Sequence, residues 1–182
     1  MEQEEKKYPY LEALKIAQNV LARLAPHCER IEIAGSIRRQ KEDVGDIEIV
    51  AIPKPFMIGL FENGIASVVN KWQKVKGDLE KNCKYTQRIL PEGIKLDLFF
   101  AEKGNWGNTF ATRTGSAEYS RYILAGTWSS MGYHSENGYL HKDGVRIDVP
   151  EEKDLFDMLK IPYIEPKDRI YEKRTKTKAK RD

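Results

Sequence analysis

One run of residues, 46–52 (DIEIVAI), constrains the fold more than any other segment of the chain. β-Branched residues dominate it and Pro53 follows, which predicts a strand that ends at the proline. Side chains alternate across a strand, so Asp46 and Glu48 point to one face and Ile47 and Ile49 point to the other. We therefore expect a sheet with one apolar, covered face and one face that carries two carboxylates.

A β-hairpin is predicted further along the chain. Its strands cover residues 84–90 and 94–100, and Pro-Glu-Gly at 91–93 supplies the turn. In the second strand Asp97 lies on the face opposite Ile94, Leu96, Leu98 and Phe100. A carboxylate in so apolar a stretch is costly to bury unless it is paired, protonated or bound to a metal ion.

Alternation alone leaves two interpretations of Asp46, Glu48 and Asp97 open. They line either the solvent-facing side of a half-buried sheet or a shared cation site. Two residues of strand rise separate the Cα atoms of Asp46 and Glu48 by roughly 6 to 7 Å, which allows both carboxylates to reach one divalent ion.

The remaining patterns complete an α+β fold. They predict helices over residues 10–25, 60–75, 117–131 and 151–159, a short strand over 31–33 and a second hairpin over 138–149. We interpret four aromatic residues as core rather than as stacking platforms: Trp106, Tyr122, Trp128 and Tyr133. A mixed sheet with flanking helices is thus followed by a small helical lobe with a β-hairpin.

Composition excludes several classes of protein. The 182 residues carry a net charge of +3 and include 40% hydrophobic residues, with neither an apolar run of bilayer length nor a charged-then-apolar leader. We therefore expect a cytoplasmic or nucleoid-associated protein that is neither secreted nor bound to a membrane. Cys28 and Cys83 form no CxxC motif, which favours two reduced thiols over a zinc site.

The last ten residues, 173–182, contain six lysines and arginines. A run of like charge is typical of a solvated, disordered tail, and contact with phosphates is the alternative interpretation.

A second motif precedes the first carboxylate. Gly35-Ser36-Ile37-Arg38-Arg39 places a glycine, a hydroxyl and two guanidinium groups after a strand, where a helix N-terminus can present N–H groups to phosphate oxygens. Gly45 removes a side chain beside Asp46 and allows close approach. Gly-Ser, two arginines and Gly-Asp-x-Glu thus occur within fourteen residues. This combination favours chemistry on a metal and a nucleotide over a solvated sheet face.

These segments closely resemble the nucleotidyltransferase signature of the family X, or polymerase beta-like, DNA polymerases. Thr114-Gly115-Ser116 is similar to the turn before a helix of that family's nucleotide-binding lobe. Residues 163–169 (YIEPKDR) are similar to its closing segment. The resemblance implies a polymerase beta-like palm with an N-terminal helix over residues 1–103 and a small nucleotide-binding lobe over 104–172. It also implies a minimal, monomeric form of the enzyme, similar to short viral members.

The resemblance further implies the roles of individual residues. Asp46, Glu48 and Asp97 are the expected catalytic ligands of two Mg²⁺ ions, for which Mn²⁺ is a possible substitute. The expected nucleotide-binding residues are Gly35, Ser36, Arg39, Gly45, Thr112, Arg113, Gly115 and Ser116. The expected DNA-binding residues are Arg121, Lys142, Arg146 and Lys167.

Two departures from the family pattern affect these expectations. Glu48 stands where the family usually has aspartate, and Thr112-Arg113 replaces an aromatic pair that contacts the nucleotide sugar. Our first hypothesis is a DNA-directed DNA polymerase that uses dNTPs to fill short gaps during repair, with gapped or primer-template DNA as its partner. The alternatives are a template-independent nucleotidyltransferase acting on a nucleic-acid end or small acceptor, and a binding module that has lost catalysis.

Overall fold

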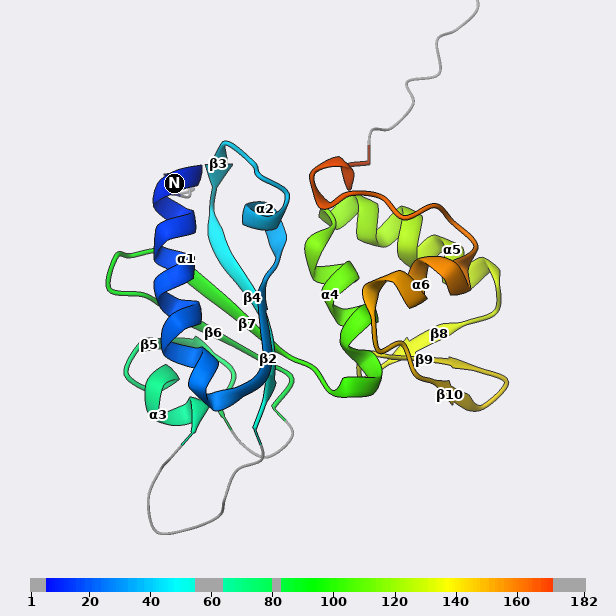
Figure 1. Cartoon of the computed structure of the whole chain (residues 1–182), viewed down its shortest axis with the longest axis horizontal. Helices are drawn as coiled ribbons and strands as arrows, with labels where there is room; N and C mark the ends of the chain where they lie inside the picture. Colours follow the sequence, from blue (N-terminus) through cyan, green and yellow to red (C-terminus); the bar gives the residue numbers. More distant parts are fainter. Residues whose placement is uncertain (1–5, 55–63, 80–82, 172–182) are drawn as a thin grey trace, which may run out of the picture.

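A computed structural model describes residues 6–54, 64–79 and 83–171. It has the predicted α+β architecture, in two groups of elements that lie side by side in Figure 1. The predicted division at residue 103 falls where one group gives way to the other, and as a domain boundary it stays a prediction. The basic tail over 173–182 lies outside the described residues. Among those described, no helix is both long and apolar enough to span a bilayer.

The first group, here called the sheet lobe, contains most of the strands. Its elements are β1 (Tyr8–Pro9), α1 (Tyr10–Leu24), η1 (Ala25–His27), β2 (Cys28–Ile33), α2 (Gly35–Arg38), β3 (Asp43–Val44), β4 (Asp46–Pro53), α3 (Ile65–Val69), β5 (Gln73–Lys76), β6 (Tyr85–Ile89) and β7 (Lys95–Phe100).

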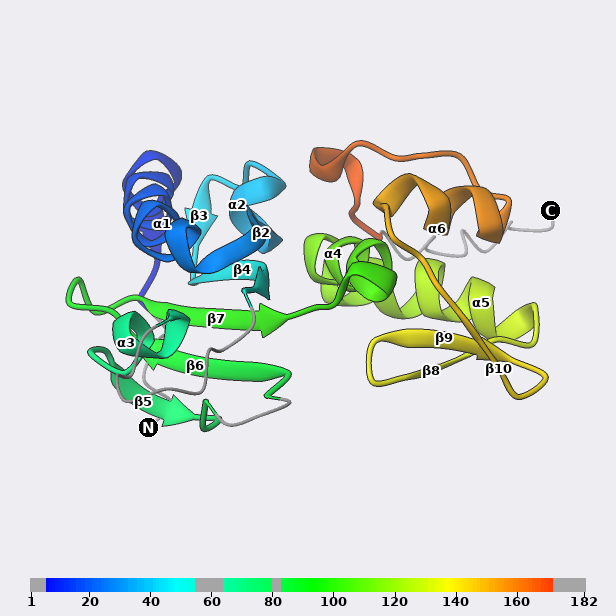
Figure 2. The same cartoon turned by 60° about the horizontal axis from the view of Figure 1, so that its bottom comes forward.

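The central sheet has the strand order β2-β4-β7-β6-β5. Strands β4 and β7 run parallel and the other neighbours run antiparallel, so the sheet is mixed. Helix α1 covers one face (Figures 1 and 2). Ile47 and Ile49 of β4 and Leu96 and Leu98 of β7 are fully buried in the cluster that contains the apolar side of α1. This burial fixes which face of the sheet remains for the carboxylates.

The second group, here called the helical lobe, follows η2. Its elements are η2 (Lys103–Asn105), α4 (Trp106–Thr114), the π-helix η3 (Tyr119–Ala125), α5 (Gly126–Ser130), β8 (His134–Glu136), β9 (Tyr139–Lys142), β10 (Val145–Ile147), α6 (Glu152–Leu159) and η4 (Pro166–Asp168).

Helix α4 connects the two lobes. Its buried Trp106 and Phe110 pack in one cluster with Val50 of β4 and Phe99 of β7. Val50 and Phe99 lie on the sheet face opposite α1, because Ile49 and Leu98 point toward α1. The helical lobe therefore packs against the same face of the sheet that carries the carboxylates.

Several predicted elements are confirmed. The helix at 10–25, the strand at 46–52 and the two hairpins match α1, β4, the β6–β7 pair and the β9–β10 pair to within a few residues. The predicted helix at 117–131 is helical throughout η3 and α5, although its first part is a π-helix.

The helix predicted over 60–75 is wrong in its second half. Helix α3 ends at Val69, and Gln73–Lys76 forms edge strand β5, which pairs with β6. Pairing with an existing strand outweighs weak helical propensity there. Residues 60–63 lie outside the described chain.

Among the four aromatic residues expected in the core, Tyr122 is the error. Trp106 and Trp128 are buried and Tyr133 packs against the helical-lobe core. Tyr122 is 43% exposed and its ring lies 5.0 Å from that of Tyr171. The π-helix turns this residue away from the core face that regular helical spacing would give it.

Candidate active site

Three carboxylates meet on one face of the sheet. Asp46 and Glu48 lie two residues apart on β4, and the parallel register places Asp97 of β7 directly opposite Glu48. The alternating burial of both strands directs all three away from the core under α1. This is the face that strand alternation predicts for each carboxylate.

Two neighbours on β6 hold Asp97. The Tyr85 hydroxyl donates to Asp97 Oδ1 over 2.7 Å, and Gln87 Nε2 donates to the same oxygen over 2.6 Å. Burial and this hydrogen bond raise the pKa of the Tyr85 phenol, which therefore remains a donor at neutral pH. The two donors fix one carboxylate oxygen and leave lone pairs of the other for a ligand.

Glu48 lies in an electrostatically unfavourable position. Burial raises its pKa to about 7, the negative charges of Asp46 and Asp97 act in the same direction, and Arg39 and Arg113 oppose them. The two arginines therefore do not offset the burial of Glu48 and the repulsion from the two aspartates, so its ionised form is disfavoured. A bound divalent cation would supply the missing positive charge. Mg²⁺ suits this site because it prefers oxygen ligands.

Gly35 allows α2 to approach Glu48. Its φ is +60°, and a Cβ atom there would lie only 1.8 Å from Glu48 Oε2. The Ala34 amide, one residue earlier, donates to the Glu48 carbonyl over 2.8 Å. The glycine therefore permits both the left-handed backbone and the contact with the carboxylate.

Ser36 supplies an unpaired polar atom beside this contact. Within the described ranges its Oγ is buried and has no hydrogen-bond partner. Buried hydroxyls without a partner are uncommon because the lost hydrogen bonds to water are not replaced. An unpaired hydroxyl at the start of α2 fits an acceptor such as a phosphate oxygen.

A cleft of about 460 Å³ lies between the two lobes at the carboxylates. On the sheet-lobe side it is lined by Arg39, Asp46 and Glu48. On the helical-lobe side it is lined by Thr112, Arg113, Gly115, Ala117, Ser120, Arg121, Ala125 and Trp128. Of the predicted nucleotide-binding residues, the cleft thus brings together Arg39, Thr112, Arg113 and Gly115.

Two arginines of the cleft have defined contacts. Arg39 donates through Nη1 to the carbonyls of Thr114 and Gly115, over 2.7 and 3.1 Å. The guanidinium of Arg113 lies 4.1 Å from the centre of the Phe99 ring. Both cations stand close enough to Glu48 to lower its pKa.

Other predicted nucleotide-binding residues lie at the edge of this arrangement. Gly45 is next to Asp46, but a Cβ there would lie 3.0 Å from Lys7 Nζ, so a lysine already occupies the space beside it. Ser116 Oγ accepts from the Tyr119 amide over 3.1 Å, which caps the start of the following helix.

The four predicted DNA-binding residues lie on four different elements. Arg121 of η3 lines the cleft. Lys142 of β9 lies over the Tyr133 ring, Arg146 of β10 pairs with Asp148, and Lys167 is exposed on η4. The cleft brings in Arg121 and not the other three.

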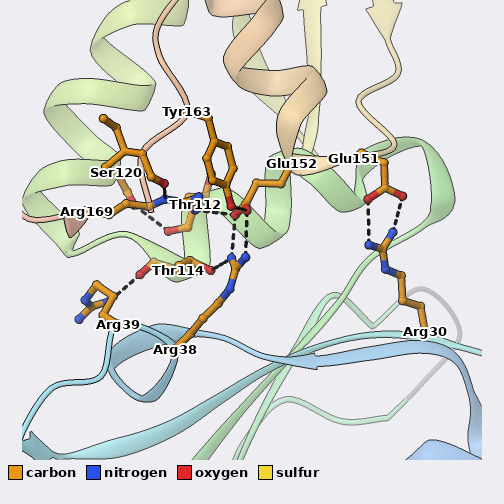
Figure 3. A network of polar contacts seen from close by, with 11 residues as sticks. Arg30, Arg38, Arg39, Thr112, Thr114, Ser120, Glu151, Glu152, Tyr163 and Arg169 are labelled. Atoms are coloured by element: carbon orange, nitrogen blue, oxygen red, sulfur yellow. Dashed lines mark hydrogen bonds and ion pairs between the residues drawn. The ribbon is translucent and has the colours of Figure 1, made fainter. Parts of the chain in front are cut away.

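An ion-pair network joins the lobes beside the cleft (Figure 3). Arg38 of α2 donates to the Thr114 hydroxyl over 2.7 Å and to both carboxylate oxygens of Glu152 over 2.7 and 2.9 Å. Glu152 also accepts from the fully buried Arg169 and from the Tyr163 hydroxyl.

Sequence reasoning missed this role of Glu152. In the sequence Glu152 is one of several acids at the start of the helix predicted over 151–159, and no spacing relates it to Arg38, 114 positions earlier. Tyr163 and Arg169 belong to the closing segment that resembles the family, but the resemblance does not pair them with Glu152. A second, more exposed link joins Arg30 to Glu151 over 2.7 Å.

Residues 110–170 match the family model for the DNA polymerase beta thumb. The matched segment includes both Thr114-Gly115-Ser116 and the closing segment at 163–169. It supports a polymerase beta-like family and implies that the chain binds DNA. No curated protein matches the sequence.

Proposed function

We propose that the chain is a DNA-directed DNA polymerase of the polymerase beta-like type, which adds a nucleotide from a dNTP to a primer 3′ hydroxyl during short-gap repair. One observation carries the proposal: Asp46 and Glu48, with Asp97 beside Glu48 on the next strand, face a cleft whose opposite wall belongs to the segment that matches a polymerase thumb. Under this proposal the sheet lobe is the nucleotidyltransferase palm.

The carboxylates would hold two Mg²⁺ ions, with Asp46, Glu48 and Asp97 as ligands. When bound, the ions would acidify the primer hydroxyl and neutralise the triphosphate and departing pyrophosphate. Tyr85 and Gln87 hold Asp97 through its Oδ1, which would leave Oδ2 for the metal ions. No protein nucleophile is needed for an in-line displacement.

The nucleotide would bind across the two lobes. Ser36 offers its unpaired hydroxyl to the triphosphate, and Arg39 and Arg113 offer positive charge from opposite walls of the cleft. Because Arg39 also bonds to the carbonyls of Thr114 and Gly115, it links nucleotide binding to the position of the helical lobe.

A second candidate is a template-independent nucleotidyltransferase. Thr112 and Arg113 line the cleft where the family has the aromatic pair that contacts the sugar, which favours a less selective nucleotide pocket. The same carboxylates would carry this reaction, so the two candidates differ in acceptor and not in chemistry.

Primer extension separates the candidates. The substrate is a duplex with a one-nucleotide gap, supplied with Mg²⁺ and each dNTP in turn, beside a single-stranded primer as control. Addition of the template-matched nucleotide alone supports the polymerase. Equal addition of all four nucleotides, also to the single strand, supports the template-independent enzyme. Failure to extend either substrate contradicts both.

A further inference from the structure

A second group of side chains of the types that bind metals lies on the three-stranded sheet of the helical lobe, which has the strand order β10-β9-β8. His134 of β8 and His141 of β9 are directly opposite in the antiparallel register. Glu136 lies two residues after His134 and therefore on the same face of β8. Leu140, the neighbour of His141, is fully buried in the core. The two histidines and the glutamate thus share the outer face of the sheet.

The distances within this group suit metal binding. The two imidazole rings are stacked with their centres 5.3 Å apart, and one ligand atom from each of the three residues lies within 4.8 Å of the others. Ligand atoms around tetrahedral Zn²⁺, at about 2.0 to 2.1 Å from the ion, are roughly 3.4 Å apart. His134 and Glu136 are exposed, so rotation of their side chains can close the difference.

A ring nitrogen of His141 has no hydrogen-bond partner among the described residues and is therefore available to bind a metal ion. In the part of the chain that the structure describes, His141 Nδ1 is buried without a hydrogen-bond partner. Arg146 stands opposite His141 on β10 and is a cation on the same face. Its guanidinium pairs with Asp148 over 3.2 Å and lies over the Tyr139 ring, so its charge is engaged elsewhere.

We propose that His134, Glu136 and His141 form a binding site for Zn²⁺, with solvent in the fourth position. Two imidazoles and one carboxylate are ligands that zinc prefers, whereas Mg²⁺ prefers oxygen ligands alone. The site is therefore chemically distinct from the three carboxylates of the cleft. Since its ligands come from both β8 and β9, a bound ion clamps these strands together.

Zinc titration of the full-length chain tests the site. Calorimetry is carried out with millimolar Mg²⁺ present, so that the carboxylates of the cleft are occupied. We expect one Zn²⁺ per chain and a rise in melting temperature on binding. His134→Gln and His141→Gln should each weaken binding by about 100-fold or more, beyond the 10- to 100-fold typical of a lost outer-shell partner.

The chain offers matched controls. His27→Gln removes the remaining histidine of the sequence, and Cys83→Ser removes a partly exposed thiol; both should leave the zinc affinity unchanged. Substitution of Co²⁺ should give a visible absorption band that His141→Gln abolishes. The absence of zinc binding, or binding that survives both histidine substitutions at 134 and 141, would overturn the proposal. Neither outcome depends on polymerase activity.

Discussion

At the scale of single residues, the position of Glu48 depends on Gly35. Gly35→Ala would place a Cβ 1.8 Å from Glu48 Oε2 and would also strain a backbone with φ of +60°. We expect nucleotide addition to fall by about 100-fold or more because Glu48 must move out of the carboxylate group. The measurement is the single-turnover rate on gapped DNA.

Gly144→Ala is the matched control for this substitution. Gly144 has a φ of +76°, but a Cβ there would meet no atom within 4 Å. Both alanines carry a backbone strain of about 1 to 2 kcal/mol, so Gly144→Ala should lower the free energy of unfolding by about that amount and Gly35→Ala, which also meets Glu48, by at least that amount. An equal loss of activity in the two variants would contradict the contact with Glu48.

Ser36→Ala should separate stability from activity. The Ser36 hydroxyl is buried without a partner among the described residues, so its removal should leave the free energy of unfolding unchanged or raise it by up to about 1 kcal/mol. The KM for dNTP should rise, because the triphosphate loses a donor. A variant with unchanged KM would show that the hydroxyl does not contact the nucleotide.

At the scale of elements, α2 and α6 are joined by a buried carboxylate. Glu152→Gln would leave the fully buried Arg169 without its counter-ion, and we expect the free energy of unfolding to fall by about 3 to 5 kcal/mol. Glu151→Gln, next to it, removes the charge from the exposed pair with Arg30, while the glutamine oxygen can still accept the capping hydrogen bond from the Asp154 backbone, and it should cost less than about 1 kcal/mol. Urea unfolding of the two variants would contradict this account if their losses were equal.

The same carboxylate makes stability depend on pH. Burial alone would raise the pKa of Glu152, but hydrogen bonds from Arg38 and Arg169 and their charges lower it from 4.5 to about 2. The folded protein therefore takes up this proton less readily than the unfolded chain. The contribution is complete above pH 4.5 and is lost as the pH falls toward 2. The stability difference between wild type and Glu152→Gln should shrink over that range, and a constant difference would contradict it.

The elements also show where sequence patterns are informative. The run at 46–52 predicted both the strand and the faces of Asp46 and Glu48, because period-two alternation is a local property. Helix α4 was not predicted, since its sequence, WGNTFATRT, is rich in weak helix formers. What stabilises it is tertiary: Gly107 lies so close to the Glu151 backbone that a Cβ would be 2.1 Å from the carbonyl oxygen.

At the scale of the whole molecule, the cleft forms because the helical lobe packs against the same face of the sheet that carries the carboxylates. The sheet supplies the carboxylates, and α4 packs beside them through Trp106 and Phe110. The sequence indicated the carboxylates and the arginines but not their cross-lobe partners. Pairs such as Arg38 and Glu152 arise only when segments far apart in sequence are packed together.

If the three carboxylates catalyse nucleotide transfer, Asp97→Asn should nearly abolish it. Asparagine retains the Oδ1 that accepts from Tyr85 and Gln87, so the variant loses the charge while keeping the hydrogen bonds. Asp157→Asn, at an exposed position on α6, is the matched control. The measurement is the single-turnover rate of nucleotide addition to a one-nucleotide gap with Mg²⁺.

We predict that Asp97→Asn lowers this rate by about a thousandfold or more, which corresponds to roughly 4 kcal/mol of transition-state stabilisation, while Asp157→Asn retains the wild-type rate. An Asp97→Asn protein that adds nucleotides at the wild-type rate would contradict the account.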